Sequence, residues 1–138
     1  MPRTPQDITD AELAVLQVLW EQGPATIRQI TEVLYPRGGT SHYATVQKLL
    51  ERLESKECVW RDRAGAVHVF AAALERDELV GRRLEAVAAK LCGGSWTPLL
   101  THLVQNKKLS SADRQMLRHL IDELDQAAQS KKRGKGAS

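Results

Sequence analysis

The chain has 138 residues, of which 42% are hydrophobic and 27% charged, as in a globular protein with one small domain and an appendage. It has no apolar run near the ~20 residues that cross a bilayer and no secretory signal at its start, so we expect a cytoplasmic protein without membrane insertion. The net charge of +3 is weak evidence for a nucleic-acid partner, because four positive charges cluster near the C-terminus, at Lys131, Lys132, Arg133 and Lys135.

The first part of the chain predicts three helices. Thr9–Glu12 reads as a capping box, and apolar residues then recur at helical spacing until Gly23 and Pro24. A second box at Thr26–Gln29 starts a short helix that ends before a loop rich in proline and glycine. Thr40 or Ser41 is expected to cap a third helix. Its apolar stripe consists of Val46, Leu49, Leu50 and Leu53.

A change of pattern after Lys56 predicts a β-hairpin. Residues 59–63 and 66–70 are rich in β-branched and aromatic side chains, and Ala64-Gly65 lies between them. Glycine accepts the positive φ of a tight turn, so we expect the turn there, with Arg61 and Arg63 near the tip. Three helices followed by a hairpin is the order of a winged helix-turn-helix domain, which we place at residues 1–73.

The second half predicts three more helices without a core of their own. Residues 75–91 form the first, and Ser95 and Ser110 mark the starts of the others. A lone helical unit of this size is marginal, so its apolar stripes predict burial against a second copy. We expect a helical dimerisation domain at 74–128 and a disordered basic tail at 129–138. The expected interface residues are Leu79, Leu84, Val87, Leu100, Leu103, Leu117, Leu120, Ile121 and Leu124.

The fold class is therefore mainly α with a small β-hairpin, and its third helix is the expected DNA-reading element. In a winged helix the exposed start of this helix enters the major groove, while the wing lies along the backbone. The first helix is acidic, whereas basic and short polar residues gather on the expected reading face and wing. The candidate DNA contacts are Arg28, Ser41, Tyr43, Thr45, Gln47, Lys48, Arg52, Arg61 and Arg63.

No pattern of catalytic or metal-binding residues is present in the sequence. The four histidines are scattered, no glycine-rich phosphate loop occurs, and Cys58 and Cys92 lack the spacing of a metal site. We expect both cysteines to be small buried side chains, and we expect no enzymatic activity, metal or cofactor. A winged-helix adaptor that binds protein rather than DNA and an oligomerisation scaffold remain alternatives.

Several ordered segments resemble the penicillinase repressor family, of the BlaI/MecI type. They are the Thr9–Trp20 helix start, Gly23-Pro24, the run from Tyr43 to Leu53, and the later segments at Leu91–Ser95 and Lys108–Ile121. The resemblance covers nearly the whole chain except both ends. It implies a winged-helix N-terminal domain, a helical dimerisation domain, a homodimer and repression of transcription from a palindromic operator in double-stranded DNA.

The resemblance also implies how repression is relieved. Many members are inactivated when a membrane sensor with a cytoplasmic protease triggers cleavage in the dimerisation domain, at an Asn-Phe pair in antibiotic-responsive members. This chain has His102 and Leu103 at the aligned position, which is therefore its candidate cleavage position, and the difference from Asn-Phe argues against β-lactam sensing. The C-x-C pairs of copper-responsive members are absent from the tail. Another winged-helix regulator with a small-molecule or redox trigger is the nearest alternative.

Overall fold

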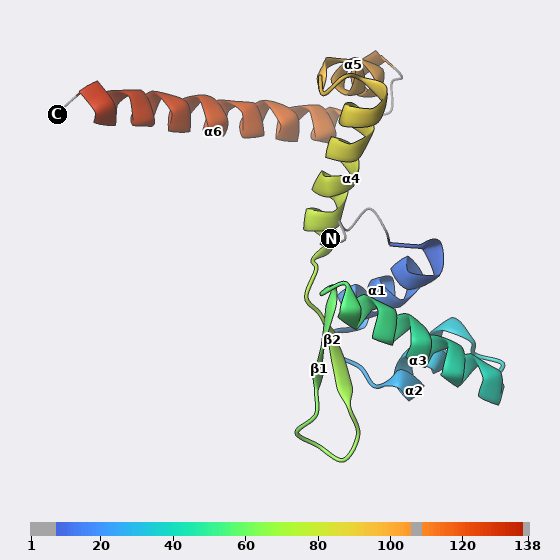
Figure 1. Cartoon of the computed structure of the whole chain (residues 1–138). Helices are drawn as coiled ribbons and strands as arrows, with labels where there is room; N and C mark the ends of the chain where they lie inside the picture. Colours follow the sequence, from blue (N-terminus) through green and yellow to red (C-terminus); the bar gives the residue numbers. More distant parts are fainter. Residues whose placement is uncertain (1–7, 106–108, 137–138) are drawn as a thin grey trace. The chain divides into compact units, whose positions relative to one another are not determined.

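The computed structural model describes residues 8–105 and 109–136, and it is mainly helical in this range, as the sequence predicts (Figure 1). The chain divides into two compact units, Met1–Lys90 and Leu91–Ser138. The elements of the first unit are α1 (Asp10–Gln22), α2 (Ile27–Leu34), α3 (Thr40–Ser55), β1 (Val59–Asp62), β2 (Val69–Ala72) and nearly all of α4 (Arg76–Leu91). Those of the second unit are α5 (Thr97–Gln105) and α6 (Ser111–Gly136).

The first two helices begin at the predicted capping residues. The Thr9 hydroxyl accepts from the Glu12 backbone N–H at 3.2 Å, and Thr26 and Gln29 bond reciprocally at 3.2 and 2.9 Å. Gly23 ends α1 with a φ of 83°, a conformation that favours glycine. One detail differs from the predicted box, because the Glu12 carboxylate accepts from the Thr9 hydroxyl, at 3.0 Å, rather than from its backbone.

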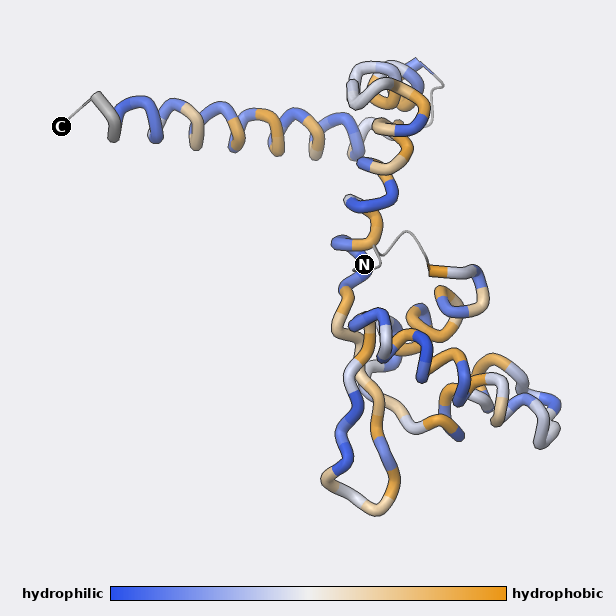
Figure 2. Tube along the Cα trace, in the orientation of Figure 1, coloured by the Kyte–Doolittle hydropathy of each residue, from blue (hydrophilic) through white to orange (hydrophobic). Residues whose placement is uncertain are grey.

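The core of the first unit lies between the three N-terminal helices and the sheet. Phe70 of β2 and Leu16, Ile30 and Leu50 of the helices are among its largest fully buried side chains. All four residues of the predicted α3 stripe are at most 5% exposed, which confirms the stripe. Figure 2 shows apolar and hydrophilic residues alternating along these helices, as expected for helices with one buried face.

The hairpin is shorter than predicted, and its connection is longer. The strands pair antiparallel from Val59 opposite Ala72 to Asp62 opposite Val69, so residues 63–68 connect them and the two-residue turn is wrong. The Asp62 carboxylate accepts from the Ala64 backbone at 2.9 Å, which favours a local turn over the strand ladder. Phe70 also exchanges two backbone hydrogen bonds with Ala25, at 2.8 and 2.9 Å, and so joins the hairpin to the α1–α2 loop.

The boundary between the units lies at Lys90, later than the predicted end of the winged-helix domain at residue 73. The start of α4 belongs to the first unit because its side chains complete that core. Leu79 is only 4% exposed and joins the core cluster. Arg83 donates to the Ile8 carbonyl at 3.2 Å, and the Trp20 indole N–H donates to the Leu74 carbonyl at 2.8 Å.

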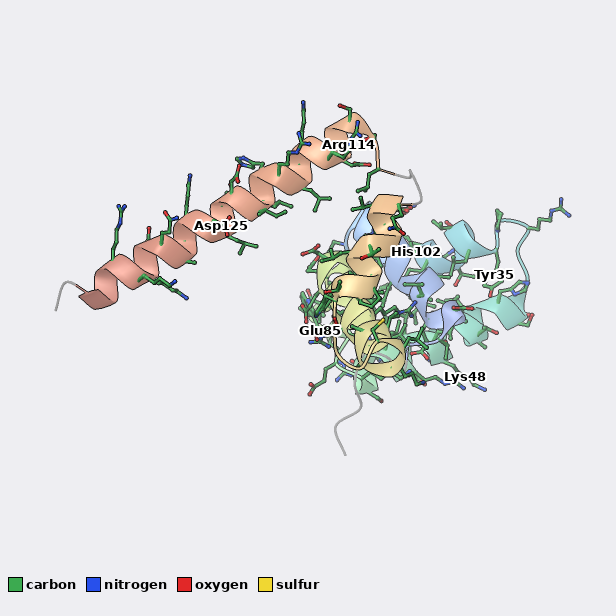
Figure 3. The ribbon with its side chains drawn as sticks, turned by 90° about the horizontal axis from the view of Figure 1, so that it is seen from above. Tyr35, Lys48, Glu85, His102, Arg114 and Asp125 are labelled. Atoms are coloured by element: carbon green, nitrogen blue, oxygen red, sulfur yellow. The ribbon has the colours of Figure 1, made fainter. Side chains whose placement is uncertain are left out.

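The second unit has no buried side chain among its described residues, 91–105 and 109–133. Its last helix starts as predicted, because Ser110 and Asp113 exchange hydrogen bonds at 3.1 and 3.2 Å. The side chains of Arg114 and Asp125 stand out from α6 and are exposed (Figure 3). In the part of the chain that the structure describes, no helix is long and apolar enough to cross a membrane.

The basic tail is helical where it is described, and the prediction of disorder is wrong there. Helix α6 continues through Gln129 to Gly136. Adding residues to an existing helix avoids the cost of nucleation, and Gln129, Lys131, Lys132 and Arg133 are good helix formers, although Gly134 and Gly136 are not. Composition alone therefore underestimated the order of this segment, because it ignored the helix that the segment extends.

Candidate nucleic-acid interface

Helix α3 presents a polar face on the outside of the first unit. The candidate contacts on this helix, Ser41, Tyr43, Thr45, Gln47, Lys48 and Arg52, are all exposed. Figure 3 shows Lys48 at the periphery of the unit. Because the opposite side of α3 is buried in the core, the helix cannot rotate without exposing four apolar side chains. The polar face is therefore held in one orientation.

Thr45 and Gln47 lie on opposite edges of this face, since residues two positions apart in a helix are separated by roughly 200°. The Thr45 hydroxyl donates to the Ser41 carbonyl at 3.0 Å, which fixes its rotamer and leaves its methyl group and lone pairs outward. The Gln47 amide has no hydrogen-bond partner among the described residues. It is therefore free to bond a ligand through both its oxygen and its nitrogen.

The start of α3 differs from the prediction, because the N-cap is Gly39 rather than Thr40 or Ser41. Gly39 has a φ of 125°, and a Cβ there would lie 3.0 Å from a ring carbon of His42, so glycine is required. No side chain caps the first turn. The His42 N–H donates to the Gly39 carbonyl at 3.3 Å, so the backbone N–H groups of Thr40 and Ser41 are the ones available to an anion, as a phosphate contact needs.

The loop before α3 is held by a ring stack that the sequence did not predict. The rings of Tyr35 and His42 lie parallel, with centroids 4.1 Å apart and an interplanar angle of 6°. Arg28 and Tyr43 line an open depression beside this loop. The Arg28 side chain is 84% exposed and pairs only loosely with Glu32, at 3.5 Å, so its charge remains accessible.

The structure separates the two arginines expected at the wing tip. Arg63 lies in the connection between the strands, and its side chain is 62% exposed. Arg61 lies within β1, is only 17% exposed, and holds its guanidinium 4.7 Å from the centre of the Phe70 ring. The predicted place of Arg61 at the tip is wrong, because the strand turns its side chain inward toward Glu54 of α3.

A buried ion pair links the start of α1 to the end of α3. Lys56 Nζ donates to both carboxylate oxygens of Glu12, at 2.7 and 2.8 Å, and the two side chains are 9% and 1% exposed. Sequence reasoning missed this pair because 44 residues separate its members. Nearby, burial raises the pKa of the Cys58 thiol, which disfavours the reactive thiolate. No metal-binding group of histidine, cysteine or acidic residues occurs among the described residues.

The expected dimer residues fall into two classes. Leu79 is buried in the first unit and has almost no surface left for a partner, so it is better assigned to that core. The others are exposed or, in the case of Leu117, partly exposed. His102 and Leu103, the candidate cleavage position, lie on α5, where no residue is buried. Of the expected interface residues, those that are exposed are Leu84, Val87, Leu100, Leu103, Leu120, Ile121 and Leu124, at 38% to 70%.

Comparisons with known proteins agree on a family of regulators. The profile of the penicillinase repressor family matches residues 8–123. The transcriptional regulator BlaI of Mycobacterium tuberculosis is 36% identical over 118 residues, which cover 84% of this chain and 83% of that protein. The penicillinase repressor of Bacillus licheniformis is 23% identical over 123 residues, covering 89% of this chain and 94% of that protein.

Among solved structures, the transcriptional regulator Tm0710 from Thermotoga maritima aligns with a TM-score of 0.46 and 18% identity, over 90% of this chain and 78% of that one. The sequence relatives are named as regulators rather than enzymes, which agrees with the expectation of a protein without catalytic activity. The family match spans both units, from the residue before the α1 cap into α6. The chain belongs to the penicillinase repressor family of transcriptional regulators.

Proposed function

We propose that this chain represses transcription as a homodimer that binds a two-fold symmetric operator in duplex DNA. The observation that carries the proposal is the polar face of α3. It is fixed by a buried apolar stripe on one side and begins with an uncapped turn. A helix of this kind fits the major groove with its first turns toward the bases. Two copies related by a two-fold axis would place two such helices on a palindrome.

The residues of this surface divide into two roles. Gln47 can bond an adenine edge through both amide atoms, and the Thr45 methyl can contact the methyl group of thymine. Phosphates carry no sequence information, so residues that bind them only position the protein. Those positioning residues are Arg28, Ser41, Tyr43, Lys48, Arg52 and Arg63, together with the first amides of α3.

The second unit supplies the dimer contact in this proposal. Its apolar side chains have no core of their own, and Leu120, Ile121 and Leu124 are 48%, 52% and 70% exposed in a single chain. Leu124 lies four residues after Leu120 and three after Ile121, so the three side chains form one stripe along α6. An exposed apolar stripe of this length is costly in water, and a second copy of the same helix would cover it.

Repression would be relieved by cutting the second unit. The bond between His102 and Leu103 lies in α5, a nine-residue helix without a buried side chain. Such a helix opens at low cost, which a protease needs because its active site binds an extended strand. A protease linked to a sensor is the expected partner. Since these two residues replace the Asn-Phe pair of antibiotic-responsive members, that protease would need a different specificity.

The proposal is tested with a duplex selected from a random pool by this chain. Gln47→Ala should weaken binding to the selected duplex by about 1–3 kcal/mol and leave scrambled duplex unaffected. Lys48→Ala, one position along the same helix, should weaken both and lower the salt slope by about 1 per copy. Fluorescence anisotropy at several salt concentrations measures both. Equal losses for the two duplexes with Gln47→Ala contradict the reading role, and salt-independent binding favours a protein adaptor.

A further inference from the structure

One carboxylate connects the reading helix to the wing. Glu54 lies in the last turn of α3, and its carboxylate forms ion pairs with two arginines of the hairpin. Arg61 Nη2 donates to Oε1 at 3.0 Å, and Arg63 Nη2 lies 3.7 Å from Oε2. A negative charge in the last turn of a helix opposes the helix dipole, so this position does not serve the stability of α3. Its role therefore lies in its two arginine partners.

The two partners are held very differently. Arg61 is 17% exposed, its guanidinium lies over the Phe70 ring at 4.7 Å, and it contacts His68 Nδ1 at 3.4 Å. Its Nε is buried without a partner among the described residues, so the side chain is confined by packing. Arg63 is 62% exposed, and its longer distance to Glu54 is typical of an ion pair that solvent screens. Only Arg63 can leave Glu54 without disturbing the core.

We propose that Glu54 is a positioning residue that withholds Arg63 from duplex DNA until a phosphate is placed to take it. The inference rests on the proposed function. On an operator, base contacts of α3 fix the position of the protein along the DNA, so a phosphate lies at one defined place beside the wing. The Arg63 guanidinium then leaves the Glu54 carboxylate and binds this phosphate. On random duplex the protein has no fixed register, and Arg63 stays with Glu54. The exchange adds affinity only where the sequence is correct.

This arrangement predicts different numbers of phosphate contacts on the two kinds of DNA. Each phosphate neutralised adds about 0.9 to the slope of the logarithm of affinity against the logarithm of salt concentration. The wild-type slope should therefore include Arg63 on the operator but not on random duplex. Removing the Glu54 charge should free Arg63 for any phosphate, so binding to random duplex should tighten and sequence discrimination should fall.

The test compares Glu54→Gln with Glu51→Gln. Glutamine keeps an oxygen that accepts from Arg61, so the hairpin should stay in place, and thermal unfolding followed by circular dichroism checks this. Glu51 is an exposed carboxylate on the same helix without an ion-pair partner among the described residues. We expect Glu54→Gln to steepen the slope on random duplex by about 1 per copy and to leave the operator slope unchanged. Glu51→Gln should leave the difference between the two slopes unchanged.

The double variant Glu54→Gln with Arg63→Ala identifies the cation. It should return the slope on random duplex to the wild-type value, because no arginine is left to release. If Glu51→Gln and Glu54→Gln change both duplexes alike, bulk charge explains the effect and the inference is overturned. If Glu54→Gln weakens both duplexes, Glu54 is only a structural anchor. A wild-type chain whose duplex binding does not depend on salt contradicts the proposed function itself, and the wild-type titration alone reveals it.

Discussion

The two units of this chain use apolar residues in opposite ways. In the first unit, Phe70, Leu50 and the rest of the core cluster are almost completely removed from water within one chain. In the second unit, no described residue is buried, although Leu120, Ile121 and Leu124 follow one another at helical spacing. The comparison teaches that the first unit has a buried core within one chain, whereas the described part of the second has none. We propose that another copy of the chain covers the apolar residues of the second unit.

The largest expected effect comes from placing a charge in the apolar stripe of the second unit. Leu120→Asp should abolish the dimer at micromolar concentration, because two unpaired carboxylates would be buried at a cost of several kcal/mol each. Gln115→Asp places the same charge on the opposite side of α6 and should leave the dimer intact. Sedimentation velocity measures both. A Leu120→Asp chain that remains dimeric would show that this stripe is not the interface.

The next largest effect concerns the first unit alone. Lys56→Met leaves the Glu12 carboxylate, only 1% exposed, without its cation, so the free energy of unfolding should fall by about 3–5 kcal/mol. Adding Glu12→Leu removes the unpaired carboxylate and should restore most of the lost free energy of unfolding. Urea unfolding monitored by tryptophan fluorescence measures the effect. If Lys56→Met alone costs less than about 1 kcal/mol, water reaches the pair and the unit is looser than described.

The smallest effect is expected from the end of α6. Truncation after Gln129 removes four positive charges of the second unit, at Lys131, Lys132, Arg133 and Lys135, of which the first three are exposed. Non-specific affinity and the salt slope should decrease slightly, while the ratio of operator to random binding should not change. Competition titration with both duplexes measures that ratio. A truncated chain that no longer prefers its operator would show that the basic helix end reads sequence.

Local patterns predicted the elements of the first unit well. The boxes at Thr9 and Thr26 and the apolar stripe of α3 each depend on residues within a few positions of one another. The Gly39 cap was missed because residues 36–39 were interpreted only as a loop, and a glycine N-cap without a side-chain hydrogen bond leaves no capping pattern in the sequence. The tail was misjudged because its composition was read without the helix that it continues.

Contacts between residues far apart in the sequence could not be predicted from the sequence patterns. The Glu12–Lys56 pair and the burial of Leu79 depend on how helices pack, and neither charge nor periodicity indicates which partners meet. The same holds for the wing, where β-branched and aromatic side chains predicted two strands but not that β1 turns Arg61 toward Glu54. The candidate DNA surface was predictable because α3 has one buried face, and its remaining positions are exposed by necessity.

The central claim, that a dimer reads DNA with α3, is tested most directly by the composition of its complex with a selected duplex. Analytical ultracentrifugation with labelled duplex measures how many chains bind, and repeating it at increasing salt measures the electrostatic share of binding. We predict two chains per duplex, bound together without a one-chain intermediate, and an affinity that falls steeply with salt. One chain per duplex, or binding that does not respond to salt, would contradict the account.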